Sequence, residues 1–79
     1  MYEKLYSQFK EIMVEELGAD EANIKPESEL VADLDINSLD FMNVIMVAEE
    51  KFDVFFDENR LRELKTVDDV VKYIVELKD

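Results

Sequence analysis

The sequence predicts an all-α fold: a small bundle of three longer helices and one short helix, with a long loop between the first two longer helices. Three segments repeat apolar residues at the spacing of an α-helix. No stretch alternates apolar and polar residues with the composition of a strand. The chain also holds one Gly and one Pro in 79 residues, so few positions break a helix. This length predicts a single domain over residues 1–79.

The first predicted helix spans Tyr2–Leu17. Its apolar residues at helical spacing are Tyr2, Leu5, Tyr6, Phe9, Ile12, Met13 and Leu17. Gly18 follows them, where a left-handed residue commonly ends a helix. From residue 19 to residue 37 the chain holds Pro26 and no sustained period, with a possible short helical turn at Ser28–Val31. Loops this long in small domains are usually functional.

Three further helices are expected in the second half of the chain. One runs from about Ser38 to Lys51, and a short one covers about Asp57 to Leu61. The last begins after Thr66, an N-cap residue followed by acids in the first turn. Its predicted core face holds Val67, Val70, Val71, Ile74 and Leu77.

Composition excludes several classes of function. With 21 acidic and 9 basic residues, the net charge of −12 repels nucleic acids and anionic membranes. Hydrophobic residues make up 48% of the chain, which favours a packed core over disorder. Without Cys or His there are no disulfides, thiol nucleophiles or histidine bases. The longest apolar run, residues 44–48, is far shorter than a membrane span, and we expect a cytoplasmic monomer.

The second helix is too apolar for an ordinary surface helix. Its apolar residues are Leu39, Phe41, Met42, Val44, Ile45, Met46, Val47, Ala48 and Phe52. Such a helix is either central and buried or exposes a surface for a partner. Acids lie near both of its ends, which favours a docking surface for basic partners. We assign Met46 to that surface, with an outward Ile45 as the alternative.

The segment before this helix, residues 33–40, carries the most specific pattern. Asp33, Asp35 and Asn37 match the first, third and fifth positions of a calcium-binding EF-hand loop. The sixth position, however, holds Ser38 where the loop needs Gly, and the twelfth holds Val44 where it needs Glu. We therefore expect no metal site. Taken alone, Ser38 is typical of a helix N-cap.

The whole segment resembles the acyl carrier protein family. Asp33-Leu34 and Asn37-Ser38-Leu39-Asp40, before an apolar helix ending Glu49-Glu50-Lys51-Phe52-Asp53, are similar to the usual signature Asp-Leu-Gly-x-Asp-Ser-Leu-Asp. The resemblance covers essentially the full chain and implies an acyl-carrier-like four-helix bundle. Two positions depart from the signature: Asp35 replaces its glycine and Asn37 the aspartate before the serine.

The resemblance implies a non-catalytic carrier. Ser38 would bear 4′-phosphopantetheine, transferred from coenzyme A by a phosphopantetheinyl transferase (holo-acyl carrier protein synthase). The arm would carry acyl groups as thioesters between enzymes of fatty-acid or related lipid or polyketide biosynthesis. Transferase, acyl-loading and acyl-processing enzymes would dock through basic patches. The partner-binding positions are Leu39, Asp40, Met42, Met46, Glu49, Glu50 and Phe56.

The residues themselves agree with modification by another protein. Ser38 has no histidine to activate it, and a helix N-terminus favours an attached phosphate. Two alternatives stay open. In one, the protein is an acidic helical adaptor or nucleic-acid mimic, and Ser38 is only a cap. In the other, it is an aminoacyl or D-alanyl carrier, which shares the serine.

Overall fold

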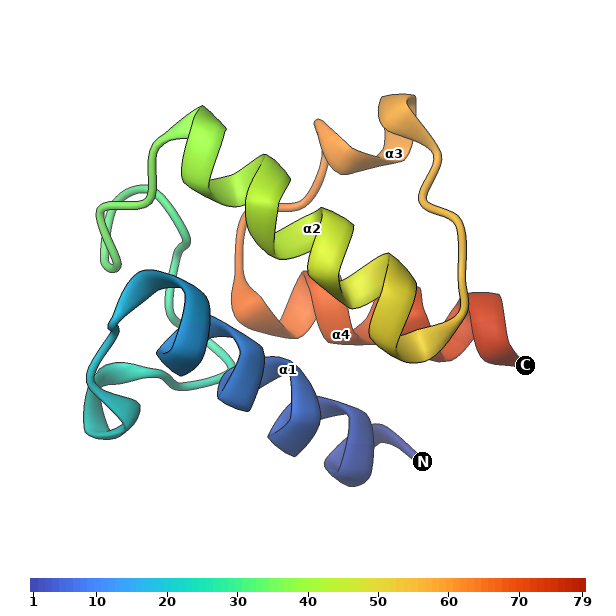
Figure 1. Cartoon of the computed structure of the whole chain (residues 1–79), viewed down its shortest axis with the longest axis horizontal. Helices are drawn as coiled ribbons and strands as arrows, with labels where there is room; N and C mark the ends of the chain where they lie inside the picture. Colours follow the sequence, from blue (N-terminus) through green and yellow to red (C-terminus); the bar gives the residue numbers. More distant parts are fainter.

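The computed structural model describes all residues from 1 to 79 and is built of helices (Figure 1). The elements are α1 (Tyr2–Leu17), the 3₁₀ turn η1 (Glu21–Asn23), α2 (Ser38–Phe52), α3 (Glu58–Leu61) and α4 (Val67–Lys78). Only one isolated bridge, between Glu29 and Thr66, has β-type pairing. The all-α prediction is confirmed. None of the helices is both long and apolar enough to cross a membrane.

The end of α1 shows why the single glycine lies where it does. Gly18 has φ 67° and ψ 23°, in the left-handed region, and its N–H donates to the Val14 carbonyl at 3.0 Å. A side chain would be strained at this φ even though no atom lies within 4 Å of the place of its Cβ. The predicted helix end is confirmed.

The long loop is tied down by α4, and this changes one expectation. The loop contains η1, at Glu21–Asn23, and a later single turn in which the Asp33 N–H donates to the Glu29 carbonyl at 3.0 Å, but no helix forms at Ser28–Val31 itself. That segment is instead held against the start of α4. The Leu30 N–H donates to the Lys65 carbonyl at 2.8 Å, and the Val67 N–H donates to the Ser28 carbonyl at 3.1 Å.

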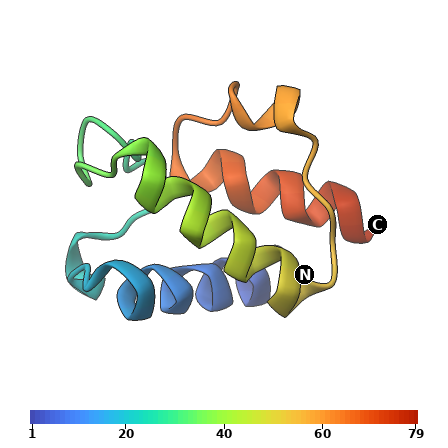
Figure 2. The same cartoon turned by 45° about the horizontal axis from the view of Figure 1, so that its top comes forward.

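The core lies where α1, α2 and α4 meet (Figure 2). The largest fully buried side chains are Phe9, Ile12, Met13, Ile24, Ile45, Val67, Val70, Val71 and Ile74. On α4 the predicted apolar face is buried except for Leu77, in the last turn, which is exposed. A reciprocal capping box between Thr66 and Asp69 starts this helix.

The short helix α3 is held by side chains of α4. A helix of four residues is not stable alone. The Asp57 N–H donates to the Tyr73 hydroxyl at 2.9 Å, and the rings of Phe56 and Tyr73 pack with centroids 5.4 Å apart. Arg60 pairs with Glu76 at 3.0 Å, and its guanidinium lies 4.5 Å from the centre of the Tyr73 ring. These contacts fix α3 and the residues just before it.

Candidate functional site

Ser38 is the first residue of α2, and it is not the cap of that helix. The N-cap is Asn37, whose backbone is extended and whose side-chain oxygen accepts the Asp40 N–H at 2.8 Å. The cap interpretation of Ser38 is therefore wrong, because the helix begins one residue earlier than that interpretation requires. Ser38 is exposed, and its hydroxyl forms no hydrogen bond within the protein.

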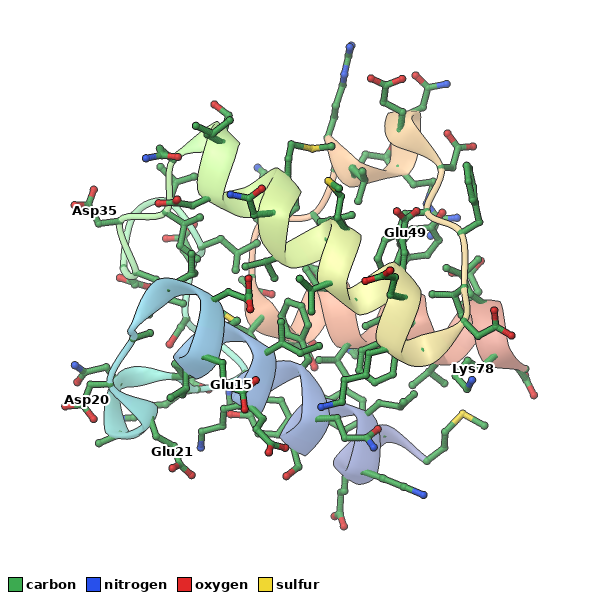
Figure 3. The ribbon with its side chains drawn as sticks, in the orientation of Figure 1. Glu15, Asp20, Glu21, Asp35, Glu49 and Lys78 are labelled. Atoms are coloured by element: carbon green, nitrogen blue, oxygen red, sulfur yellow. The ribbon has the colours of Figure 1, made fainter.

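The turn before Ser38 depends on a left-handed residue. Asp35 has φ 53°, and it stands where the signature has glycine. A Cβ is costly in this region, although Asp tolerates it better than most residues. The N–H groups of Asp35 and Ile36 donate to the carbonyls of Val31 and Leu30 at 3.1 and 3.0 Å, which closes the turn. Figure 3 shows the Asp35 side chain pointing away from the protein.

An apolar pocket lies beside Ser38. It encloses about 490 Å³ between the start of α2, the loop, α3 and the connection to α4, and it is open to solvent. Its apolar wall consists of Leu30, Val31, Ala32, Ile36, Phe41, Met42, Leu61 and Leu64. This volume lies in the range of small-molecule pockets. The tertiary fold brings four segments together here, so no local sequence pattern predicts the pocket.

The exposed side of α2 carries apolar residues. Leu39 and Met46 are 74% and 61% exposed, and Met42 is also exposed. Ile45, at 1% exposure, faces the core together with Val44, Ala48 and Phe52. Of the two interpretations of this apolar helix, the structure therefore favours a helix with one buried and one exposed apolar side. Met46 lies on the exposed side, as expected, and the outward Ile45 alternative is wrong.

Glu49 and Phe56 both have structural contacts. The Phe56 N–H donates to the half-buried Glu49 carboxylate at 2.9 Å, and Figure 3 shows Glu49 pointing from α2 toward the connection to α3. Phe56 is only 4% exposed, so the prediction that it contacts partners is wrong: its ring packs on Tyr73 in the core. Its neighbour Phe55 is 84% exposed instead. Adjacent phenylalanines give no sequence signal for which one turns inward.

An acidic groove runs between α1 and α2. Its lining residues are Glu16, Asn43, Met46, Val47, Glu49, Glu50 and Asp53. Four carboxylates and no cation line it, so it favours a basic side chain of a partner. Glu16 was missed in the sequence because it lies far from α2 along the chain. Asp40 is half-buried in the first turn of α2, and Glu50 is exposed.

The clearest pKa shifts belong to side chains that join helices. Burial, together with the hydrogen bond that its hydroxyl donates to Asp68, raises the pKa of Tyr2 to about 12. Hydrogen bonds from the backbone N–H groups of Lys65 and Thr66 lower the pKa of Asp69. These groups connect α1 to α4 and hold the start of α4.

The fold and the site together define a class: a small helical bundle that presents an unbonded serine at a helix N-terminus beside an apolar pocket. A family model described as "Phosphopantetheine attachment site" matches residues 7–74. An acyl carrier protein of Helicobacter hepaticus is 39% identical over 69 residues, covering 87% of this chain and 91% of that protein. The chain belongs to the acyl carrier protein family.

Two other relatives show the same extent of similarity. The acyl carrier protein of Campylobacter lari is 38% identical, with 92% of this chain and 95% of that protein covered. That of Thermotoga maritima is 39% identical, with 91% and 89% covered. The cofactor of the family is 4′-phosphopantetheine. The free hydroxyl of Ser38, the helix N-terminus and the adjacent pocket fit this group.

Proposed function

We propose that this protein carries acyl groups as thioesters on a 4′-phosphopantetheine arm attached through a phosphodiester to Ser38. The observation that carries the proposal is the state of the Ser38 hydroxyl. Asn37 supplies the cap, so the hydroxyl is exposed, unbonded and adjacent to the apolar pocket. The family match supports the identity of the arm.

The chain binds and orients the arm, and another protein attaches it. Ser38 has no histidine or cysteine anywhere in the sequence to activate it, so a transferase must remove its proton. The Ser38 oxygen then replaces the nucleotide part of coenzyme A on phosphorus. The first turn of α2 offers free N–H groups and a positive dipole end to the attached phosphate. We therefore regard the protein as a non-catalytic carrier.

The apolar pocket shelters the part of the arm and acyl chain nearest to Ser38. Its wall of eight apolar residues excludes water from one side of a bound chain. It remains open, which allows a partner enzyme to withdraw the thioester. The pathway that we assign is fatty-acid or related lipid or polyketide biosynthesis.

The partner face consists of the exposed side of α2 and its neighbours. Its apolar centre is formed by Leu39, Met42 and Met46, with Phe55 beyond the end of the helix. Acids frame this centre, including Asp40, Glu50 and Glu16. An apolar centre with a charged rim is typical of a docking surface. The transferase and the acyl-loading and acyl-processing enzymes would bind here through basic patches.

The experiment is phosphopantetheinylation of the purified protein, followed by intact mass measurement. Incubation with coenzyme A, Mg²⁺ and a broad-specificity transferase should add the mass of one phosphopantetheine unit. Ser38→Ala should abolish the gain, whereas Ser7→Ala, at an exposed serine of α1, should leave it unchanged. A Ser38→Ala protein that still gains the mass, or a wild type that resists several transferases, would contradict the proposal. An acidic adaptor or mimic would gain no mass.

A further inference from the structure

Two cations at the pocket beside Ser38 have no partner within the fold. Arg62 and Lys65 line the pocket, and neither side chain forms an ion pair or a hydrogen bond. The ion pairs of the structure use Lys10, Arg60 and Lys72. In a chain with a net charge of −12, carboxylates are abundant. Pairing within the protein therefore does not explain why these two cations lie here.

Both cations extend from backbone that is held in place. The Lys65 carbonyl accepts the Leu30 N–H at 2.8 Å, and the Lys65 N–H donates to Asp69 at 3.0 Å. Arg62 directly follows α3, which the ion pair of Arg60 with α4 anchors. Figure 2 shows this connection passing beside the amino-terminal half of α2 on its way into α4. Arg62 and Lys65 are both exposed, and they line the same pocket as Ser38.

An anion attached to Ser38 would enter an unfavourable field. Residues 33–58 contain eight acids and one base, a local net of 1 − 8 = −7. Asp35 and Asp40 lie on either side of Ser38 along the chain. The positive end of the α2 dipole amounts to only about half a charge. On the pocket wall, in contrast, Arg62 and Lys65 balance Glu29 and Glu58, so the pocket is locally neutral.

We propose that Arg62 and Lys65 bind the phosphodiester at the root of the arm. This inference rests on the attachment to Ser38 proposed above. The guanidinium of Arg62 supplies two parallel donors that match phosphate oxygens, and the Lys65 ammonium supplies a second point charge. Their binding offsets the repulsion from the neighbouring acids and orients the arm across the apolar wall of the pocket.

The test compares apo and phosphopantetheinylated forms of the wild type, Arg62→Gln, Lys65→Gln and the double variant. Lys51→Gln is the matched control, because Lys51 is an exposed, unpaired cation at the other end of α2. Intact mass first establishes complete modification of every sample. The ³¹P chemical shift of the phosphodiester and the melting temperature are then measured at low and high salt.

We expect the double variant to move the ³¹P resonance toward that of the same phosphodiester in urea-unfolded holo protein, where no folded contact surrounds it. Its holo-minus-apo difference in melting temperature should fall by roughly 4 °C at low salt and by less at high salt. Lys51→Gln should change neither quantity. If every variant is completely modified and all show the same ³¹P shift and the same holo-minus-apo difference in melting temperature, Arg62 and Lys65 do not bind the phosphodiester. The proposed attachment to Ser38 would be unaffected by that result.

A further arm of the experiment loads the holo protein with a carboxylate-ended and a methyl-ended acyl group. If the substitutions act only on the carboxylate-ended form, the assignment of the cations to the phosphodiester is wrong. Absence of any mass gain would overturn the attachment at Ser38 and this inference with it.

Discussion

The side chain of Asn37, and not that of Ser38, accepts the Asp40 N–H at the start of α2, at 2.8 Å. One residue caps the helix, and the hydroxyl of the next forms no hydrogen bond within the protein. Asn and Ser are about equally good caps, so the identities of the two residues do not decide between them. The extended backbone of Asn37 does, because it places that residue just outside the helix.

The free energy of unfolding should respond differently to substitutions at Asn37 and at Ser38. We expect Asn37→Ala to lower the free energy of unfolding by about 1 kcal/mol, because it removes the cap. Ser38→Ala should change it by less than ~0.5 kcal/mol, since the Ser38 hydroxyl forms no hydrogen bond to lose. Urea denaturation followed by circular dichroism measures both. Equal losses would show that the serine contributes to capping in solution.

Replacing Asp35 by glycine should stabilise the protein. The residue has φ 53°, and glycine removes the steric cost of a Cβ there. Glycine also costs more backbone entropy on folding, so we expect a net gain of about 0.5 kcal/mol. Asp35→Ala is the control, because it removes the same charge but keeps the Cβ. If alanine stabilises as much as glycine in urea denaturation, repulsion between acids is the cause and backbone strain is not.

The two adjacent glutamates at the end of α2 should behave differently. Glu49→Ala removes the acceptor of the Phe56 N–H, and we expect it to lower the free energy of unfolding by roughly 1–2 kcal/mol. Glu50→Ala, at an exposed position without a hydrogen bond or ion pair, should stay within ~0.5 kcal/mol of wild type. Thermal and urea melts of the pair measure this. A similar loss for both would mean that Glu49 does not hold the α2–α3 connection.

The exposed side of α2 should tolerate a charge that its buried side does not. Met46→Glu should keep the helix content and raise the KM of the transferase at every salt concentration, because it removes apolar contact. Glu50→Lys should slow transfer mainly at low salt, since it acts on the encounter. Ile45→Glu should unfold the domain by burying a charge. If Met46→Glu leaves transfer unchanged, α2 is not the docking surface for the transferase.

Stability should fall in acid partly through Asp69. Hydrogen bonds from the Lys65 and Thr66 N–H groups lower its pKa below the ordinary value of 3.8. A carboxyl whose pKa is lower in the folded than in the unfolded state stabilises the fold at any pH above the pKa that the carboxyl has in the unfolded chain. That stability is lost as the pH falls through the folded pKa. We expect Asp69→Asn to make the decline below pH 3.8 shallower in urea denaturation, and an unchanged slope would contradict this role.

Local chemistry explains why most helix bounds were predicted. Gly18 ends α1 and Thr66 caps α4 through contacts within a few residues, so sequence spacing alone locates them. The expected turn at Ser28–Val31 failed because its backbone groups pair with the start of α4, far away in the sequence. Glu16 was not predicted to line the groove beside α2 for the same reason, because it is also far from α2 in the sequence.

The sequence by itself determined the helical class, the family signature and Ser38 as the candidate attachment residue, because these depend on residue type and local spacing. Only the tertiary structure decided which side of each apolar segment faces water. Ile45 and Phe56 turn inward while Met46 and Phe55 remain exposed, because the positions of α1 and α4 determine where apolar surface can be buried. The pocket with Arg62 and Lys65 likewise exists only after the loop, α2 and α3 have been packed together.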